Sequence, residues 1–233
     1  MATQIVNYTQ RSGSTDRIFE DLPQAIGEAL EQVALTTHYP TGAILFSEGQ
    51  TARGAFFIRR GRVKLSLCAS DGRTLILRMV DGGSPLGIAA VVSSRPYEAT
   101  AEIQEPSEIS FVRQADLLRL MRQHGELALW VTQRISMGYA CTCREIRDLI
   151  LSDSASEKLA RLLVGWLDQN TKSKNPTQVK MALTHEEIGQ MIGSSRETVS
   201  RLLAGFKKQH LIQQSGSTLV IPDRVALESL ITA

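Results

Sequence analysis

The 233-residue chain has few aromatic residues, only three cysteines and no long apolar run. Three cysteines do not build a disulfide scaffold, and the four scattered histidines lack metal-site spacing, so we expect no metal. No apolar stretch approaches the roughly 20 residues that span a bilayer, and the polar N-terminus lacks the apolar core of a signal peptide. The sequence therefore predicts a cytoplasmic protein with no membrane partner.

Net charge is also small, because 26 Lys and Arg nearly balance 24 Asp and Glu. The positive excess lies after Ser154, where ten basic residues accompany seven acidic ones. A mildly basic C-terminal third permits a polyanionic partner. Several motifs typical of enzymes are absent too, namely G-x-S-x-G, the P-loop and H-E-x-x-H. We therefore expect a protein that is not an enzyme.

The hydrophobic pattern is strand-like from about His38 to Val112, where short runs of Val, Ile, Phe and Leu alternate with glycines. Strands Ala55–Ile58 and Val63–Leu67 flank Arg59–Arg62, and Asp71-Gly72 is a strong hairpin dipeptide between later strands. Many short strands with regular turns predict an antiparallel barrel or roll. Residues 17–35, which precede the strands, are predicted to form short helices.

From Asp116 to Leu151 the period becomes helical. Small and apolar residues recur alternately four and three positions apart, which is a heptad seam: Ala128, Thr132, Ile135, Tyr139, Thr142, Ile146 and Leu149. One interpretation is a helix packed on its own barrel. We favour a dimerisation helix that pairs with a second copy through residues 128–150. Candidate N-caps after Leu151 predict a hinge near Asp153, followed by a helix over Ser156–Asp168 and a polar loop over Asn170–Thr177.

The most informative stretch is Leu183–Ile212. Thr184 and Glu187 form a capping box that starts a helix, and Gly193 ends it because glycine readily adopts a left-handed conformation. A serine then caps a second helix, either Ser194 or Ser195. Two capped helices joined by a short turn with glycine form a helix-turn-helix. Two short strands around Ser215–Ser217 predict a hairpin after it, the wing of a winged helix.

The second of these helices has two chemically different faces. The apolar face can dock the helix on its own domain, and it carries Val199, Leu202, Leu203 and Phe206. The polar face suits a recognition helix in the major groove of double-stranded DNA, and it carries Arg196, Glu197, Ser200, Arg201 and Lys208. Arg bonds bidentately to guanine and Glu accepts from cytosine.

Hydroxyls at the helix starts suit DNA phosphates, and they belong to Thr184, Ser195 and Thr198. Glu197 and Arg201 are four residues apart, so each can hold the other's rotamer. A solvated charged face on a helical hairpin is the alternative interpretation. We favour DNA binding because the caps, the turn glycine and the two faces all agree.

These residues resemble the Crp/Fnr family of bacterial transcription regulators, most closely its cyclic-AMP receptor protein branch. The match is specific in EEIGQMIGSSRETVSRLLAGFKKQHLI, and it extends more weakly over residues 20–225. FFIRRGRVKL is similar to a family β-roll hairpin, and GGSPLGIAAVVSSRPYEATAE is similar to its ligand-pocket segment. The resemblance implies an α+β homodimer with an N-terminal antiparallel β-roll, a long dimerisation helix and a C-terminal winged helix-turn-helix.

Four parts of the chain are expected on this basis: a flexible N-terminus (1–16), a β-roll sensor with short flanking helices (17–115), a dimerisation helix with a hinge (116–153) and a winged-helix DNA-binding domain (154–233). By position, the resemblance makes Arg196, Glu197 and Arg201 the residues that contact bases. It implies an inverted repeat of TGTGA-like half-sites, and RNA polymerase as a further partner.

The effector pocket implied by the resemblance departs from the cyclic-AMP pattern. Ile88 replaces a glutamate that binds the ribose, and Ala99 replaces the arginine that neutralises the cyclic phosphate. A buried phosphate without its guanidinium is costly, so a cyclic nucleotide is not expected in the usual mode. Another ligand or none are the alternatives. The expected pocket residues are Gly83, Leu86, Gly87, Ile88, Ala89, Ala99, Thr100, Thr142 and Cys143.

Two further alternatives stay open. Cys141 and Cys143 lie on the predicted long helix, where they are interpreted as small apolar fillers, with a redox switch as the other possibility. A ligand-binding signalling module that acts through protein partners is the alternative to a DNA-binding regulator. The sequence does not identify the effector, the target genes, or whether the bound protein activates or represses.

Overall fold

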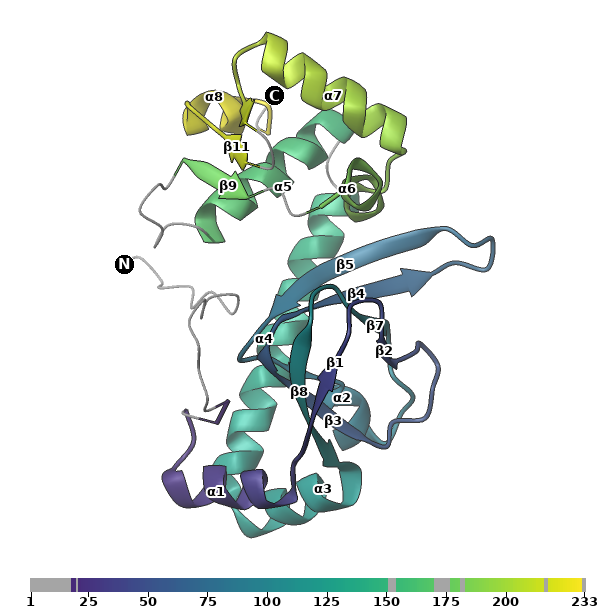
Figure 1. The fold of residues 1–233 in the computed structure, drawn as a ribbon, viewed down its shortest axis with the longest axis vertical. Coiled ribbons are helices and arrows are strands. Elements are labelled where there is room, and N and C mark those ends of the chain that lie inside the picture. Colours follow the sequence, from purple (N-terminus) through teal and green to yellow (C-terminus); the bar gives the residue numbers. More distant parts are fainter. Residues whose placement is uncertain are drawn as a thin grey trace. The chain divides into compact units, whose positions relative to one another are not determined.

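The structure, a computed structural model, describes residues 18–19, 21–150, 154–169, 177–180, 183–215 and 218–231. The chain separates into two compact units, Met1–Cys141 and Thr142–Ala233, and each is described by itself (Figure 1). Three predictions lie outside the described residues: the flexible N-terminus, the hinge near Asp153 and nearly all of the polar loop after Asn170. The domain boundaries stay predictions.

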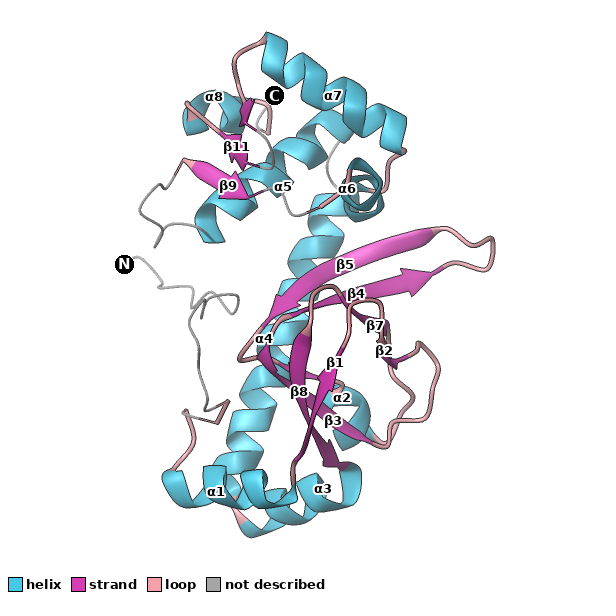
Figure 2. Ribbon diagram, in the orientation of Figure 1, coloured by secondary structure: helices cyan, strands magenta, loops and turns pink. Residues whose placement is uncertain are grey.

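Two antiparallel four-stranded sheets form the first unit, as an α+β roll requires. One sheet has the order β1 (Leu35–Tyr39), β8 (Ser107–Arg113), β3 (Gly54–Arg60) and β6 (Pro85–Leu86). The other has the order β2 (Ile44–Phe46), β7 (Thr100–Ile103), β4 (Arg62–Cys68) and β5 (Thr74–Asp81). Figure 2 shows these strands together with the helices around them.

The hairpin predicted at Asp71-Gly72 is confirmed. Strands β4 and β5 pair antiparallel on either side of it, and the Ala69 N–H donates to the Arg73 carbonyl at 2.8 Å. The Asp71 carboxylate accepts from the Arg73 backbone N–H at 3.0 Å and from its Nε at 2.7 Å. These hydrogen bonds lower the pKa of Asp71. The turn is therefore closed by its own local contacts.

The hairpin expected across Arg59–Arg62 is wrong. Strand β3 pairs with β6 and β8, whereas β4 pairs with β5 and β7, so the chain crosses from one sheet to the other at Gly61. Residues Gly54–Ile58 of β3 are all buried. Phe57 meets Phe19 edge-on on one side, while Phe56 meets Phe46 of the second sheet on the other. A strand covered on both faces belongs inside a roll.

Gly61 is required at this corner for two reasons. Its φ is +101°, which L side chains rarely adopt, and an added Cβ would lie 2.0 Å from Ser107 Oγ and 2.8 Å from Ser107 Cα. We expect Gly61→Ala to lower the free energy of unfolding by about 2–4 kcal/mol. Urea unfolding followed through the fluorescence of buried Trp130, with Trp166→Phe in the background, measures this.

The matched control for this prediction is Gly72→Ala. Gly72 also has a positive φ, +86°, but nothing lies within 4 Å of its added Cβ. It therefore tests backbone strain without a clash, which costs about 1–2 kcal/mol. Equal losses in the two variants would contradict the packing argument at Gly61.

Four helices, α1 to α4, accompany the two sheets within the described residues 21–150. In α1 (Gln24–Val33) the buried residues are Ile26 and Leu30, which confirms a helix within the predicted segment 17–35. Helix α2 (Ile88–Ser93) interrupts the strand-rich region, where Gly87 and Ser94 at its ends both adopt left-handed conformations. Helices α3 (Gln114–Gln123) and α4 (Gly125–Ile150) replace the single predicted helix, because His124 between them is extended.

The second unit packs four helices and a small sheet around one core. The helices are α5 (Ala155–Gln169), α6 (His185–Ile192), α7 (Arg196–Lys208) and α8 (Arg224–Ser229). The sheet has the order β10 (Gln213–Ser215), β11 (Thr218–Val220) and β9 (Gln178–Lys180). Pairing of β10 with β11 confirms the predicted wing. Strand β9 was not foreseen, because its short run follows a polar segment.

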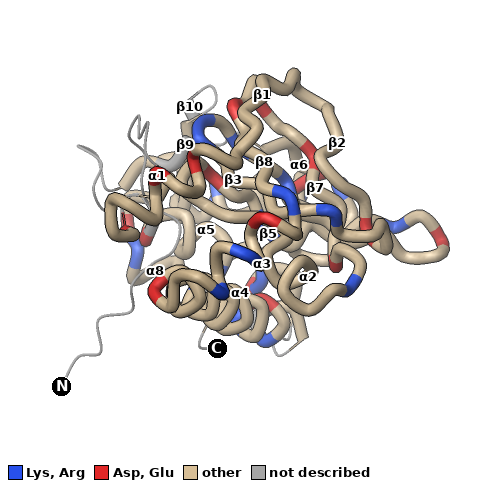
Figure 3. The backbone as a smooth tube through the Cα atoms, turned by 90° about the horizontal axis from the view of Figure 1, so that it is seen from below, with Lys and Arg blue, Asp and Glu red and all other residues tan. Residues whose placement is uncertain are grey.

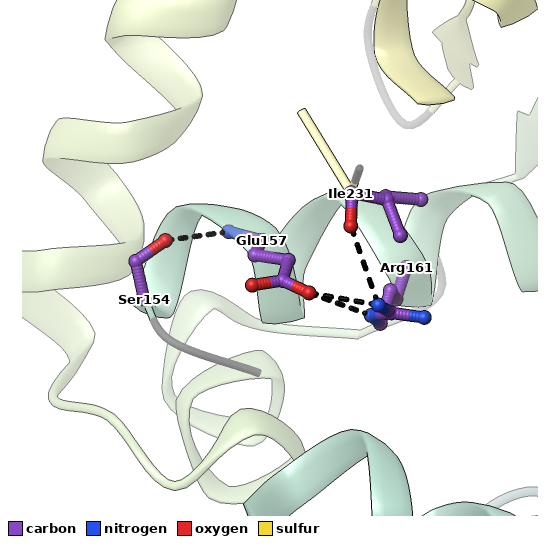
Figure 4. A network of polar contacts seen from close by, with 4 residues as sticks. All are labelled: Ser154, Glu157, Arg161 and Ile231. Atoms are coloured by element: carbon purple, nitrogen blue, oxygen red, sulfur yellow. Dashed lines mark hydrogen bonds and ion pairs between the residues drawn. The ribbon is translucent and has the colours of Figure 1, made fainter. Parts of the chain in front are cut away.

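Polar contacts fasten the start of α5 and the C-terminal segment (Figure 4). Ser154 Oγ accepts from the Glu157 N–H at 3.1 Å, which caps the helix as expected. Glu157 Oε1 pairs with Arg161 Nη2 at 2.8 Å, and that guanidinium also reaches the Ile231 carbonyl at 3.4 Å. These bonds support the core on which α7 is mounted.

Lys and Arg are interspersed with Asp and Glu along the described part of the chain (Figure 3), so neither sign of charge dominates any long stretch of it. Within the described residues, no helix has the length and apolar character needed to cross a membrane. The same residues contain no group of three or more side chains able to hold a metal ion.

Candidate nucleic-acid interface

The first helix of the predicted helix-turn-helix begins and ends as expected. Thr184 accepts from the Glu187 N–H at 3.2 Å, and the Thr184 N–H donates to the Glu187 carboxylate at 2.8 Å, which completes the capping box. Gly193 ends α6 with φ +64°, and the Ser194 N–H returns to the Gly189 carbonyl at 2.8 Å. The turn into α7 is therefore specified by local bonds.

Ser195, rather than Ser194, caps α7. Its Oγ accepts from the Thr198 N–H at 3.2 Å. The apolar face docks on the core of the unit, with Val199, Leu203 and Phe206 buried and Leu202 partly buried against them. One side of the helix is thus occupied by packing, and the opposite side is left to solvent.

The solvent side carries the residues expected to contact DNA. Arg196, Glu197, Arg201 and Lys208 are exposed, as are Thr184 and Ser195, while Thr198 and Ser200 are half-buried. Arg196, Glu197 and Arg201 lie near the N-terminal end of the helix. Two of them can donate hydrogen bonds to base edges and one can accept. The geometry that DNA binding requires is therefore present.

Glu197 is held differently from the prediction. Within the described residues 183–215, no ion pair joins Glu197 to Arg201. The pKa of Glu197 lies below its usual value because its own backbone N–H and the Ser195 hydroxyl donate to the carboxylate, with a smaller effect of the Arg196 charge. The helix N-terminus thus keeps this side chain ionised and able to accept.

Sequence reasoning missed His185, which the structure brings to this surface. Its Nδ1 lies 2.8 Å from Ser200 Oγ on the recognition helix α7. A hollow of about 370 Å³ opens beside it, lined by Thr184, His185, Glu186 and Arg196. Ser200, predicted to contact DNA, is therefore engaged with a neighbouring helix. The only signal in the sequence was a histidine directly after the N-cap of α6.

The expected effector-pocket residues of the roll are packed closely. Leu86, Ile88 and Ala99 are buried, and Gly83 and Ala89 are half-buried. The Thr100 hydroxyl accepts from the Glu48 N–H at 3.1 Å. Thr142 and Cys143 belong to the second unit, so their place beside these roll residues stays a prediction.

Tyr97 is the residue that sequence reasoning missed in this segment. A Cβ added to Gly87 would lie 2.6 Å from the Tyr97 ring, so the ring covers the pocket glycine. The ring also stacks on Phe46 at 4.0 Å between centroids, and its hydroxyl donates to the Gly54 carbonyl at 2.6 Å. Burial raises the pKa of Tyr97. The segment is held by aromatic packing.

The structure leaves the predicted seam on α4 only partly exposed in the single chain. Thr132, Tyr139 and Ile146 are exposed as predicted, but Ala128, Ile135, Thr142 and Leu149 are half-buried. Ile135 packs against the roll core, whose buried members on α4 are Leu127, Trp130 and Val131. The exposed positions spaced alternately three and four residues apart, here named the α4 stripe, are Leu129, Thr132, Ser136, Tyr139, Cys143, Ile146 and Ile150.

Large apolar side chains on the α4 stripe are well exposed. Tyr139 is 73% exposed, Ile146 51% and Ile150 72%. Cys143 lies between them and is exposed too, so it does not fill the chain's own core, whereas Cys141 is half-buried. A repeating stripe of this kind suits the seam of a two-stranded coiled coil.

Two family models match this chain. A model described as a Crp-like helix-turn-helix domain matches residues 157–230, and one described as a cyclic nucleotide-binding domain matches residues 36–124. The first includes α6 and α7 with the wing, and the second includes both sheets of the roll. Each matched segment therefore lies within one of the two compact units.

Known proteins match over most of their length. A CRP-like cAMP-activated global transcriptional regulator of Mycobacterium tuberculosis is 27% identical over 207 residues, 88% of this chain and 92% of the relative. The cAMP-activated global transcriptional regulator CRP of Pasteurella multocida is 26% identical over 184 residues, 78% of this chain and 88% of the relative. The solved structure of FixK2 from Bradyrhizobium japonicum has a TM-score of 0.75 at 21% identity, covering 86% of this chain and 98% of that one.

Proposed function

Since the chain belongs to the Crp/Fnr family of DNA-binding transcription regulators, we propose that it acts as a homodimer on an inverted repeat of TGTGA-like half-sites. The observation that carries this proposal is that Arg196, Glu197 and Arg201 are all exposed near the N-terminal end of α7. Arg pairs with guanine and Glu with cytosine, which are bases of that half-site and its complement.

An electrophoretic shift tests the proposal. Purified protein at low salt is expected to retard a palindromic TGTGA-type duplex in preference to a scrambled duplex of equal length. Half-sites one helical turn apart present their major grooves to the two copies of α7. No shift would remove the proposal, and capture of a protein partner with no DNA affinity would favour the signalling-module alternative.

The lowered pKa of Glu197 makes a pH prediction. A depressed pKa keeps the carboxylate ionised even at pH values near its ordinary pKa of about 4.5, so its contact with cytosine is lost only at more acid pH. Discrimination between the cytosine and a substituted base is therefore expected to be constant from pH 8 to 5. Fluorescence anisotropy with two probes measures the ratio, and Glu197→Gln is the control. Discrimination that declined between pH 7 and 5 would contradict this assignment.

We propose that the α4 stripe forms the dimer interface with a second copy. Its period of three and four residues fits a coiled-coil seam. The side chains at its C-terminal end are large, apolar and exposed in the single chain, whereas a helix face that stays in water carries mainly polar residues. The dimer places two recognition helices on one duplex. In this arrangement RNA polymerase is the further partner that a bound regulator engages.

We propose that the effector, if the protein uses one, is not a cyclic nucleotide in the usual mode. Ile88 and Ala99 supply neither a carboxylate for a ribose nor a cation for a cyclic phosphate. The Tyr97 ring against Gly87 supports this proposal, since it occupies space next to the pocket glycine. Calorimetric titration with a panel of cyclic nucleotides tests it, and tight binding of cyclic AMP would overturn it.

A further inference from the structure

One directional contact joins the two helices of the DNA-binding motif. Helices α6 and α7 otherwise meet through apolar side chains such as Ile188 and Val199, which belong to one core cluster. Apolar packing is non-directional and tolerates small rotations of a helix about its axis. The His185–Ser200 hydrogen bond of 2.8 Å does not tolerate such a rotation, because it requires Ser200 to face α6. It therefore sets the direction in which Arg196 and Arg201 project.

The other ring nitrogen of His185 faces a different environment. No hydrogen bond to Nε2 is found among residues 183–215, and the ring lines the hollow together with Arg196. When Ser200 donates to Nδ1, the proton of the neutral imidazole resides on Nε2. The same contact that orients α7 then presents an N–H donor beside a guanidinium, which is a pairing suited to an anion.

The charges around this ring are few. On α6, Glu186 is exposed at the hollow, while Glu187 is engaged with Thr184. On α7, Arg196 is the charged residue at the hollow. The neighbouring helix α5 contributes buried Leu159 and Leu163 to the shared core, and its Glu157, Arg161 and Asp168 are held in ion pairs elsewhere. Glu186 and Arg196 are therefore the charged side chains beside the ring at the hollow.

We propose that His185 orients the recognition helix through Ser200 and donates from Nε2 to a phosphate oxygen of the DNA backbone. The inference rests on the proposed function, namely DNA binding through α7. The phosphate contact carries no sequence information, whereas the bond to Ser200 acts on sequence discrimination through the aim of Arg196 and Arg201. His185 is thus a positioning residue for base contacts and a direct ligand of the backbone.

Anisotropy with the full-length protein, a palindromic TGTGA-type duplex and a random duplex of equal length tests this. A backbone contact acts on both duplexes, whereas an orienting contact acts on the ratio of the two affinities. Loss of one donor to a phosphate is expected to weaken binding to both duplexes by about fivefold. A purely structural role would not separate these two quantities.

Three substitutions separate the two roles. His185→Asn keeps a partner for Ser200 but loses the Nε2 donor, so its affinity for both duplexes is expected to fall about fivefold with discrimination retained. Ser200→Ala removes the orienting bond, so discrimination falls about three- to tenfold while affinity for the random duplex is retained. His185→Ala loses both. His210→Asn, at an exposed histidine with φ +59°, is the matched control and is expected to behave as wild type.

The outcomes are distinguishable. Absence of DNA binding by the wild type sinks the proposed function itself. Unchanged affinity of His185→Asn for both duplexes, or unchanged discrimination in Ser200→Ala, overturns the present inference and leaves DNA binding standing. If His185→Ala does not fold, as judged by its circular dichroism melting curve, His185→Asn and Ser200→Ala still decide the question.

Discussion

Replacing Tyr139 and Ile146 together by arginine is expected to leave the chain folded, to make it monomeric and to weaken binding to the inverted repeat by roughly 100-fold. Both side chains belong to the α4 stripe and are more than half exposed in the single chain, so the substitution disturbs little of its own core. In a dimer, the four new guanidiniums would face one another across a desolvated seam. The loss of affinity arises because linked half-site binding becomes independent binding.

Sedimentation measures the oligomeric state, and anisotropy measures affinity for the repeat and for a single half-site. The matched control places arginine at Gln133 and Ala140, which are exposed positions beside the α4 stripe. Charges there stay in contact with water in a coiled coil, so the control is expected to remain dimeric. A double variant that sediments as a dimer would refute the α4 stripe as the interface.

Arg201→Ala is expected to abolish preference at one guanine of each half-site, a loss of about 1–3 kcal/mol per position. Arg201 is exposed on the second turn of α7, and within residues 183–215 no ion pair with Glu197 competes for its guanidinium. A bidentate donor aimed at a base is lost, while the backbone contacts remain. Binding to random DNA should therefore change little.

Lys208→Ala is the control for this experiment. Lys208 is exposed at the last position of α7, so a contact with phosphate is its expected role. Its removal should weaken specific and random DNA alike and lower the salt slope by about 1. If Arg201→Ala produced that same uniform loss, the assignment of Arg201 to a base would fail.

The DNA-binding motif was predictable because its determinants are local. The capping box of Thr184 with Glu187, the left-handed Gly193 and the cap at Ser195 each involve residues within a few positions. The outward direction of Arg196 and Arg201 then follows from helical periodicity. The His185–Ser200 bond was not predictable, because it depends on how two helices pack against each other. The capping residues fix where each helix begins and ends, but not how the two helices pack.

The presence of an antiparallel roll was predictable, but the assignment of its strands to the two sheets was not. Alternating strands and Asp71-Gly72 identify the β4–β5 hairpin, yet nothing in the residues around Gly61 says that β3 and β4 enter different sheets. That division depends on the long-range pairing of β3 with β8. The seam on α4 shows the same limit, because which side of the helix the roll covers decides which heptad positions remain exposed.

The pairing of Leu35 with Phe111 also has a consequence for how the protein is made. Strand β1 leaves the ribosome early, but β8, the strand beside it in the sheet, is synthesised only after every other strand of the roll. Until then the backbone groups of this N-terminal segment have no native neighbour, and an open strand edge invites aggregation. Helices α6 and α7 close within a few residues of each other, so the order of folding need not follow the order of synthesis.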